Sequence, residues 1–155
     1  MRDKRFITEH RGGLLNKEHH ILLIKWACCC SEHVLQLFGE RLDERLKNAL
    51  LIAKDWAVGN ATTGDAMNAS VRAHTAARES DNSISTAVAR SVGHAVATAH
   101  MADHSLGAAL YALKAIKNAG KSIDTERKWQ NEQLPPEIQD IVLTARIMKE
   151  KNFRI

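Results

Sequence analysis

Aromatic residues, prolines and glycines are scarce in this sequence. Aromatics make up 5% of the 155 residues, and the chain contains 2 prolines and 8 glycines. β-Strands are enriched in aromatic and β-branched residues, whereas alanine, which is abundant here, favours helices. No sustained alternation of apolar and polar residues indicates a strand. These absences predict an all-α fold, a single compact bundle of about six to seven helices formed by the whole chain.

Long apolar runs are also lacking. The most apolar stretch, residues 21–30, contains Lys25 and is too short to cross a bilayer. Residues 1–10 are charged and have no apolar centre of the kind found in signal peptides. The cysteines Cys28, Cys29 and Cys30 are adjacent, so they suit neither a disulfide framework nor a Cys-x-x-Cys metal clamp. We expect a cytoplasmic protein that has no membrane partner and uses its cysteines as small core side chains.

Neither sign of charge dominates the sequence. The chain has 22 lysines and arginines against 18 acidic residues, which gives a net charge of +4. The basic residues gather toward the two ends, at Arg2, Lys4, Arg5 and Arg11 and again at Arg146, Lys149, Lys151 and Arg154. No basic helix carries interleaved aromatic residues, so we expect a mixed-charge surface and no nucleic-acid partner.

Polar caps and helix breakers divide the chain into seven expected helices. The candidate N-caps are Asn16, Asp43, Thr62 or Thr63, Ser83 and Asp124, and the candidate stops are Gly39, Gly59 and Gly120. The expected helices cover residues 17–38, 43–58, 64–79, 84–103, 106–119, 124–133 and 135–149. We expect the residues before Leu15 to form an ordered arm or a short helical turn.

Three of these helices carry small residues at positions i, i+4, i+7 and i+11. The positions are Ala66, Ser70, Ala73 and Ala77, then Ser91, Ala95, Thr98 and Ala102, then Ala108, Ala112, Ala115 and Ala119. Small side chains in a heptad pattern let helix axes approach closely. We therefore expect an alanine-rich, close-packed centre formed by the third, fourth and fifth helices. Trp26 and Trp56 lie on apolar faces and are also expected in the core.

No familiar catalytic pattern stands out in the sequence. Gly12 and Gly13 are not followed by the Lys-Ser/Thr pair of a phosphate-binding loop, and no Gly-x-Ser-x-Gly elbow is present. Ser91 and His94 have helical spacing but lack an orienting carboxylate in the sequence around them. We predict no catalytic residues and no cofactor, and thus a protein that is not an enzyme.

The eight histidines raise the alternative of a metal site. His100 and His104 are four residues apart, which would place them on one face of the expected fourth helix. His94 lies about 15 Å further along such a helix, so one ion could not bind all three. His74 or Asp103 would have to complete the ligand set. A metal-binding bundle that uses His100 and His104 is one hypothesis, and histidines that only hydrogen-bond within the helix packing are the other.

Trp129 stands apart from the other tryptophans because its neighbours, residues 126–132, are polar. Two interpretations remain open for it. Trp129 either anchors the short sixth helix to the bundle or forms a partner-binding surface with Arg127 and Lys128.

Several segments of the sequence match motifs of a known family. The longest is RSVGHAVATAHMADHSLGAALYALKA, residues 90–115. The opening RDKRFITEHRGGLL at 2–15, LQLF at 35–38, WQ at 129–130, LP at 134–135 and EI at 137–138 are also similar. The chain resembles, from about residue 2 to 146, the bacterial putative immunity proteins that are associated with polymorphic toxin systems.

The resemblance implies a cytoplasmic, all-helical domain that neutralises a cognate toxin by stoichiometric binding. It brings no catalytic or metal-binding residues with it. Such a complex would bury roughly 600–1,000 Å² on each partner. The candidate surfaces are the segment Arg127, Lys128 and Trp129 and the two basic ends, which would suit an acidic face of a toxin. A homodimer or another structural, oligomeric helical protein without a toxin partner is the remaining alternative.

Overall fold

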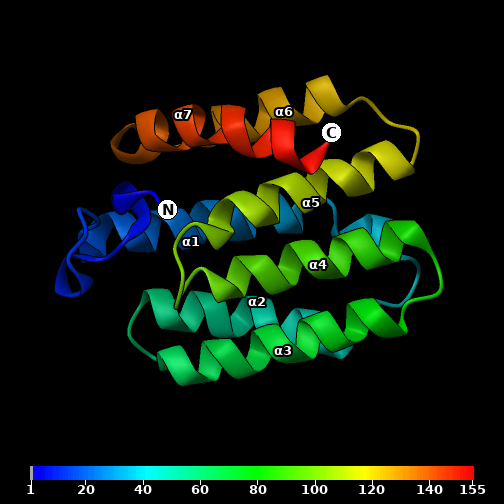
Figure 1. The fold of residues 1–155 in the computed structure, drawn as a ribbon. Helices are drawn as coiled ribbons and strands as arrows, with labels where there is room; N and C mark the ends of the chain where they lie inside the picture. The colour runs from blue at the N-terminus through cyan, green and yellow to red at the C-terminus, as the bar shows by residue number, and fades with distance from the viewer. Residues whose placement is uncertain (1) are drawn as a thin grey trace.

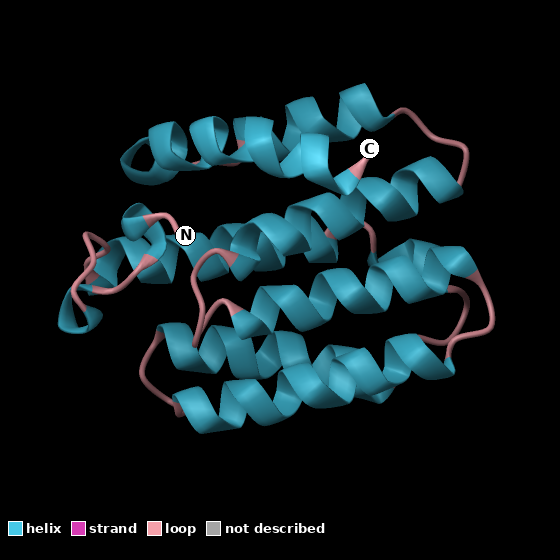
Figure 2. Cartoon of the chain, viewed as in Figure 1, coloured by secondary structure: helices cyan, strands magenta, loops and turns pink. Residues whose placement is uncertain are grey.

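The protein folds as an all-helical bundle in the computed structural model, which describes residues 2–155 (Figures 1 and 2). Its seven α-helices are α1 Lys17–Glu32, α2 Glu44–Ala57, α3 Thr63–Glu79, α4 Ser83–Ala97, α5 His104–Asn118, α6 Ile123–Glu132 and α7 Pro136–Phe153. Three short 3-10 helices, η1 Lys4–Phe6, η2 Glu9–Arg11 and η3 Leu35–Phe38, complete the secondary structure. Residues 2–155 contain no strand, which confirms the predicted fold class.

Side-chain caps begin most of the helices. The Asn16 side chain accepts a hydrogen bond from the His19 amide at 2.8 Å, as expected for the start of α1. Thr62 and Asp65 form a reciprocal capping box at the start of α3. Each cap satisfies an amide that lacks a partner inside its helix, which is why these helices begin where the sequence places them.

Two predicted caps are off by one or two residues. Asn82 caps α4 through the Ser85 amide at 2.8 Å, so the predicted cap, Ser83, lies inside the helix. Ser122 caps α6, and the predicted cap, Asp124, lies in the first turn, where its charge suits the helix dipole.

The expected fourth helix is too long. α4 ends at Ala97, and residues 98–103 form a turn before α5 begins at His104. At this end the Thr98 hydroxyl donates to the His94 carbonyl at 3.1 Å. The Ala99 amide bonds to the carbonyl three residues back, which tightens the last turn and stops the helix. Similarly, α1 ends before the predicted boundary and is followed by η3, whereas α7 extends beyond it.

The fourth helix lies at the centre of the bundle. α4 packs against α1, α2, α3 and α5, while α6 and α7 cover the other side of α5 (Figure 1). Eleven of the twelve predicted small-residue positions are buried, and the last, Ala119, is half-buried. The burial of these positions confirms the close packing predicted for the small residues of α3, α4 and α5.

The hydrophobic core has two parts that meet at α1 and α5. The larger part lies among the first five helices and includes Trp56, which is 5% exposed. The smaller part lies beneath the N-terminal arm and α7 and includes Phe6 and Trp26. The prediction that Trp26 and Trp56 are core residues is therefore confirmed.

Buried hydrogen bonds attach the last two helices to the rest. The Trp26 indole donates to the Gln130 carbonyl at 2.9 Å, and the Gln130 side-chain amide donates to the Ala109 carbonyl at 3.1 Å. The guanidinium of Arg146 donates to the side chains of Gln130 and Glu150. In the sequence, Arg146 was grouped with the basic residues of the C-terminal end. It is only 3% exposed, so it stabilises the packing of α7 and does not contribute to a basic surface.

All three cysteines are free thiols. Cys28 and Cys30 are buried, and burial raises the pKa of the Cys28 thiol to about 12. Cys28 and Cys30 thus act as small core side chains, as expected, whereas Cys29 is half-buried. Within residues 2–155, no helix combines the length and the apolar character that crossing a membrane requires.

Candidate functional site

Histidines from three neighbouring helices form a row across the bundle. The ring centroids of His74 on α3 and His94 on α4 are 5.2 Å apart, and those of His94 and His104 on α5 are 4.9 Å apart. Glycines make room for two of these rings. A Cβ atom on Gly93 would lie 2.7 Å from the His74 ring, and one on Gly107 would lie 2.7 Å from the His94 ring.

The histidine row is held by hydrogen bonds between side chains. Arg90 donates to Nδ1 of His74 at 2.8 Å, and the Nδ1 atoms of His94 and His104 are 3.0 Å apart, so one of them donates to the other. Burial, aided by nearby cationic groups, lowers the pKa of His74 to about 4 and that of His94 to about 3. Both imidazoles are therefore neutral at neutral pH, which agrees with the interpretation that they hydrogen-bond within the packing.

The prediction that His100 and His104 share one helical face is wrong. His100 lies in the turn that precedes α5, and His104 is the first residue of that helix. The residues expected to complete a ligand set are bonded elsewhere, since His74 accepts from Arg90 and Asp103 accepts from Arg2 at 3.3 Å. No group of three or more His, Cys, Asp or Glu side chains in the described chain could hold a metal ion.

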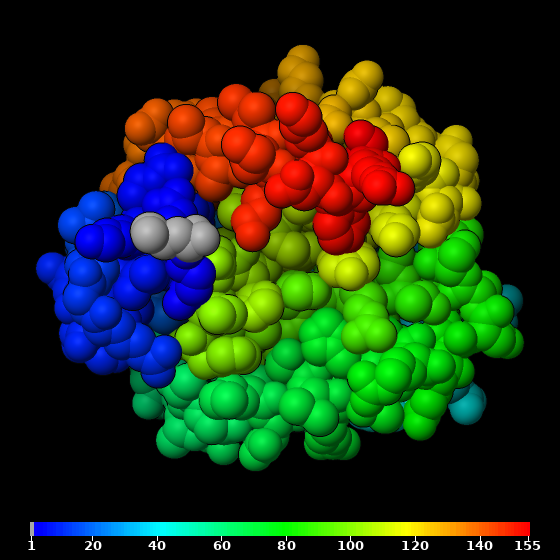
Figure 3. All heavy atoms as spheres, in the orientation of Figure 1, coloured from blue at the N-terminus to red at the C-terminus, as the bar shows by residue number. Residues whose placement is uncertain are grey.

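A second feature near this row is a shallow depression between α5 and the C-terminal end of α7. Its volume is about 370 Å³, and His94, His104, Tyr111 and Phe153 are among its lining residues. Figure 3 shows this hollow between the yellow-green surface of α5 and the red surface of α7. The His94 and Tyr111 rings stack with centroids 5.2 Å apart, so the depression is the outer end of the histidine row.

The N-terminal arm, residues 2–15, folds into a compact hook. The Leu15 amide donates to the Ile7 carbonyl at 2.9 Å, and the Leu14 amide donates to the Lys4 carbonyl at 3.0 Å. Gly13 passes so close to the Ile7 backbone that no Cβ atom would fit. The side chain of Phe6 is 1% exposed and fixes the hook to the core. We expected an ordered arm or a short helical turn, and the arm is ordered and contains the two short 3-10 helices η1 and η2.

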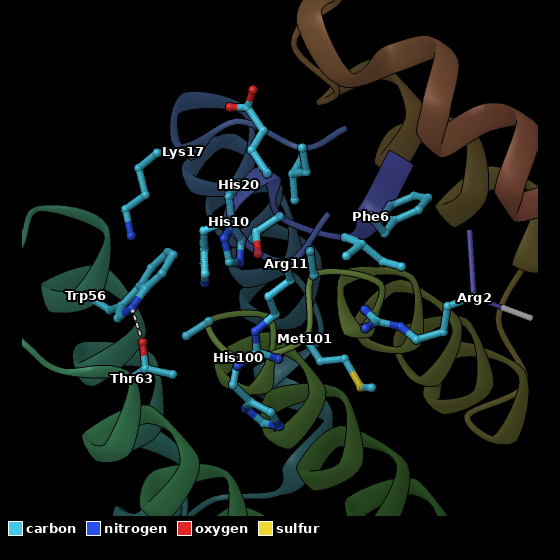
Figure 4. A pocket seen from close by; sticks show the side chains of 16 residues that line it. Arg2, Phe6, His10, Arg11, Lys17, His20, Trp56, Thr63, His100 and Met101 are labelled. Carbon is cyan, nitrogen blue, oxygen red and sulfur yellow. Dashed lines mark hydrogen bonds between the residues drawn. The ribbon is translucent and has the colours of Figure 1, made fainter. Parts of the chain in front are cut away.

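A basic pocket lies beneath this arm (Figure 4). It has a volume of about 320 Å³ and is lined by the arm, by residues of α1 and α2, by the start of α3 and by the turn after α4. Its charged and imidazole side chains are Arg2, Arg11, Lys17, His10, His20, His100 and one carboxylate, Glu9. The positive groups outnumber the negative ones, so the pocket attracts anions.

Trp56 forms one wall of the pocket. The Lys17 ammonium lies 3.8 Å from the centroid of the Trp56 ring, and the His20 ring packs against it with centroids 4.8 Å apart. Nε2 of His20 donates to the Thr98 carbonyl at 2.6 Å, which joins α1 to the turn after α4. Burial lowers the pKa of His20, so its imidazole is neutral at neutral pH.

The segment of α6 predicted to bind a partner has mixed roles. Arg127 is held by Glu150 and Asp124, each at 2.7 Å, and Lys128 is exposed. Trp129 stacks on His33, at the end of α1, with ring centroids 3.5 Å apart and an angle of 9° between the rings. Trp129 thus anchors α6 as one interpretation predicted, and it stays half-exposed, so the partner-binding interpretation remains a prediction.

The basic pocket was missed in the sequence. Its arginines were noted only as part of a basic N-terminal end, and His20 and His100 were two among eight histidines. The pocket depends on the contact between the arm and the turn after α4, which are about ninety residues apart in the chain. Because these segments are far apart in the chain, no local sequence pattern predicts their contact.

The helices and their packing place the chain among small all-α proteins. Comparison with family models assigns it further, because the model of the Imm-5 like putative immunity protein family matches residues 13–137. The chain therefore belongs to this family, which confirms the resemblance found in the sequence. Most of the N-terminal arm and of α7 lies outside the matched residues. No curated protein and no solved structure matches the chain.

Proposed function

We propose that this protein binds and neutralises a cognate bacterial toxin in the cytoplasm by stoichiometric protein–protein contact. Membership of the immunity protein family is the observation that carries the proposal. The proposed mechanism is occlusion of the toxin's working surface, without catalysis by this chain. Its rigid, capped helices support such a role, since a preordered surface loses little conformational freedom on binding.

The proposed contact surface is the outer side of α6 and α7. Lys128 is exposed and Trp129 half-exposed on α6. On α7, Ile147 and Met148 are 74% and 64% exposed, and they lie less than one turn from Glu150, the partner of Arg127. Aromatic, methionine and basic side chains around exposed apolar residues are typical of protein interfaces.

Co-expression with the toxin encoded beside this gene tests the proposal. Cells that make both proteins should grow, and the purified pair should elute as a complex with a one-to-one molar ratio. Trp129→Ala should weaken the complex by about 2 kcal/mol, roughly 30-fold, because buried aromatic anchors dominate interface energies. Lys128→Glu should slow association with an acidic toxin face.

Lys121→Glu is the matched control, because Lys121 is exposed in the turn before α6 and carries the same charge. It should bind like the wild type. Since Trp129 also anchors α6, the thermal melt of each variant must be compared before a loss of binding is assigned to the interface. Absence of both protection and complex for the wild-type protein would refute the proposed function.

Titration of the toxin separates occlusion from catalysis. Neutralisation by occlusion reaches completion at one equivalent of this protein and not before. If a small fraction of an equivalent silenced the toxin over time, the protein would be an enzyme. Light scattering of the free protein shows at the same time whether it is a monomer or a homodimer.

A further inference from the structure

Three buried side-chain polar atoms in residues 2–155 have no hydrogen-bond partner within the protein. They are Nε of Arg2, Oγ1 of Thr8 and Nδ1 of His100. All three residues line the basic pocket beneath the N-terminal arm. Buried polar atoms in folded proteins are nearly always paired, and an unpaired one is destabilising. Three such atoms belong to side chains that line one cavity, so a polar occupant of the pocket can pair with them once the side chains turn toward it.

The geometry around these atoms supports this interpretation. Thr8 is the N-cap residue of η2, yet its hydroxyl caps no amide, so it stays free for another partner. The Arg2 guanidinium is held at its other end by Asp103, at 3.3 Å. His100 lies close enough to Arg11 that the charge of Arg11 adds to burial in lowering the pKa of the imidazole. Figure 4 shows Arg11 beside His100, with Arg2 further to the right, beyond Met101.

The chemistry of the three atoms defines the class of ligand. Nε of Arg2 can only donate, while the Thr8 hydroxyl and the His100 imidazole can each donate. A group rich in acceptor oxygens satisfies all three. The charged lining favours a negative group, because Arg11 and Lys17 outnumber Glu9 among the lining residues even when Arg2 is counted as paired with Asp103. Charge-assisted hydrogen bonds to an oxyanion are stronger than neutral ones.

We propose that the pocket beneath the N-terminal arm binds a small oxyanion, a phosphate or carboxylate group. The cavity of about 320 Å³ exceeds such a group, so the anion can belong to a small metabolite whose apolar part contacts Trp56. This binding site does not rest on the proposed toxin contact, because the pocket and the surface of α6 are formed by different residues.

Titration of the full-length protein with inorganic phosphate, and separately with succinate, tests the proposal. Sodium chloride keeps the ionic strength constant in both series. Amide signals of Thr8 and His100 should shift and saturate, and the melting temperature should rise with the same dependence on concentration. A response to phosphate alone or to succinate alone identifies the group that the site accepts. No saturable response to either anion would overturn the proposal.

Thr8→Val distinguishes a ligand-binding hydroxyl from one that is merely buried. Without an anion, this near-isosteric change removes an unpaired polar atom, so the melting temperature should stay the same or rise. With phosphate or succinate, whichever binds the wild type, the affinity should fall by about tenfold or more because a charge-assisted hydrogen bond is lost. A merely structural threonine would not change the affinity.

Arg11→Gln should weaken anion binding by a similar factor, because it removes a charge beside His100. Arg72→Gln is the matched control, since Arg72 is exposed on α3 and does not line the pocket. It should keep the wild-type affinity. If Thr8→Val and Arg11→Gln both bind like the wild type, the anion binds elsewhere and the proposal is wrong. Toxin neutralisation by the same variants should be unchanged, which separates this site from the proposed function.

Discussion

Two glycines determine how closely the central helices approach. Gly93 faces the ring of His74, and Gly107 faces the ring of His94, each at a distance that leaves no space for a Cβ atom. The His94 ring cannot move aside easily, because it bonds to His104 and stacks on Tyr111. Histidine and glycine thus form matched pairs, in which the glycine gives up helix propensity so that a ring can pack.

Gly107→Ala should therefore destabilise the protein although alanine is the better helix former. The helix propensity gain is at most about 1 kcal/mol, whereas overpacking a core costs about 1–3 kcal/mol. Urea denaturation should show a net loss of about 1 kcal/mol in the free energy of unfolding. Gly64→Ala is the control, because its Cβ would meet only the Thr62 hydroxyl at 3.6 Å, and its stability should be unchanged or higher. Equal stability of Gly107→Ala and the wild type would contradict the steric argument.

Residues whose environment depends only on helix phase could be predicted from the sequence. Ala95 and Ala112 are buried because they repeat at the period of a helix. The partner of His74 and the surroundings of Thr8 could not be predicted, because they involve another helix and a turn about ninety residues away in the chain. The candidate sites are of the second kind, so the sequence indicated their residues without showing which ones meet.

The boundaries of the helices also depend partly on local sequence and partly on tertiary packing. Caps such as Asn16 and Thr62 act within four residues, so the starts of their helices were predictable. The end of α4 was not, because Ala99 and Ala102 remain buried in the turn that follows. The apolar period therefore continues after the helix has stopped. This error is also what placed His100 on a helix and produced the metal-site hypothesis.

Larger side chains in the alanine-rich centre should overpack it. Ala95 and Ala112 are fully buried on α4 and α5. Replacing either with leucine should lower the free energy of unfolding by about 1–3 kcal/mol, since the facing helix leaves no space. Ala119→Leu, at the half-buried position just after the end of α5, should cost clearly less. Thermal melts of the three variants measure the difference, and equal melting temperatures would mean that the centre is not closely packed.

For the whole molecule, the buried histidines couple stability to pH. His20, His74, His94, His100 and His104 all have lowered pKa values, with burial as the main cause. They join α1, α3, α4, α5 and the turn after α4, so each helix near the centre packs against a neutral imidazole. A protein assembled in this way is most stable where its histidines are neutral also in the unfolded chain.

The free energy of unfolding should therefore decrease as the pH falls below 6.5, the ordinary pKa of a histidine side chain. Above that pH the histidines are neutral in both the folded and the unfolded state, so the two states bind the same number of protons and the free energy of unfolding does not depend on pH through these groups. Below it the unfolded chain binds protons, but folded His74 and His94 resist protonation until about pH 4 and about pH 3. The cations Arg78 and Arg90 near His74 act in the same direction. Urea denaturation between pH 7 and about 4.5 stays above the range in which most carboxylates titrate.

His94→Gln should make this dependence on pH shallower. A single histidine contributes at most one proton, so the slope should decrease by up to about 1.4 kcal/mol per pH unit between pH 6 and about 4.5. His74→Gln should have a similar effect on the slope, although both variants lose packing and start from a lower stability. The change in slope, and not the loss of stability, carries the prediction. If both variants keep the wild-type slope, the buried imidazoles on α3 and α4 take up protons in the folded state, and stability depends on pH through other groups.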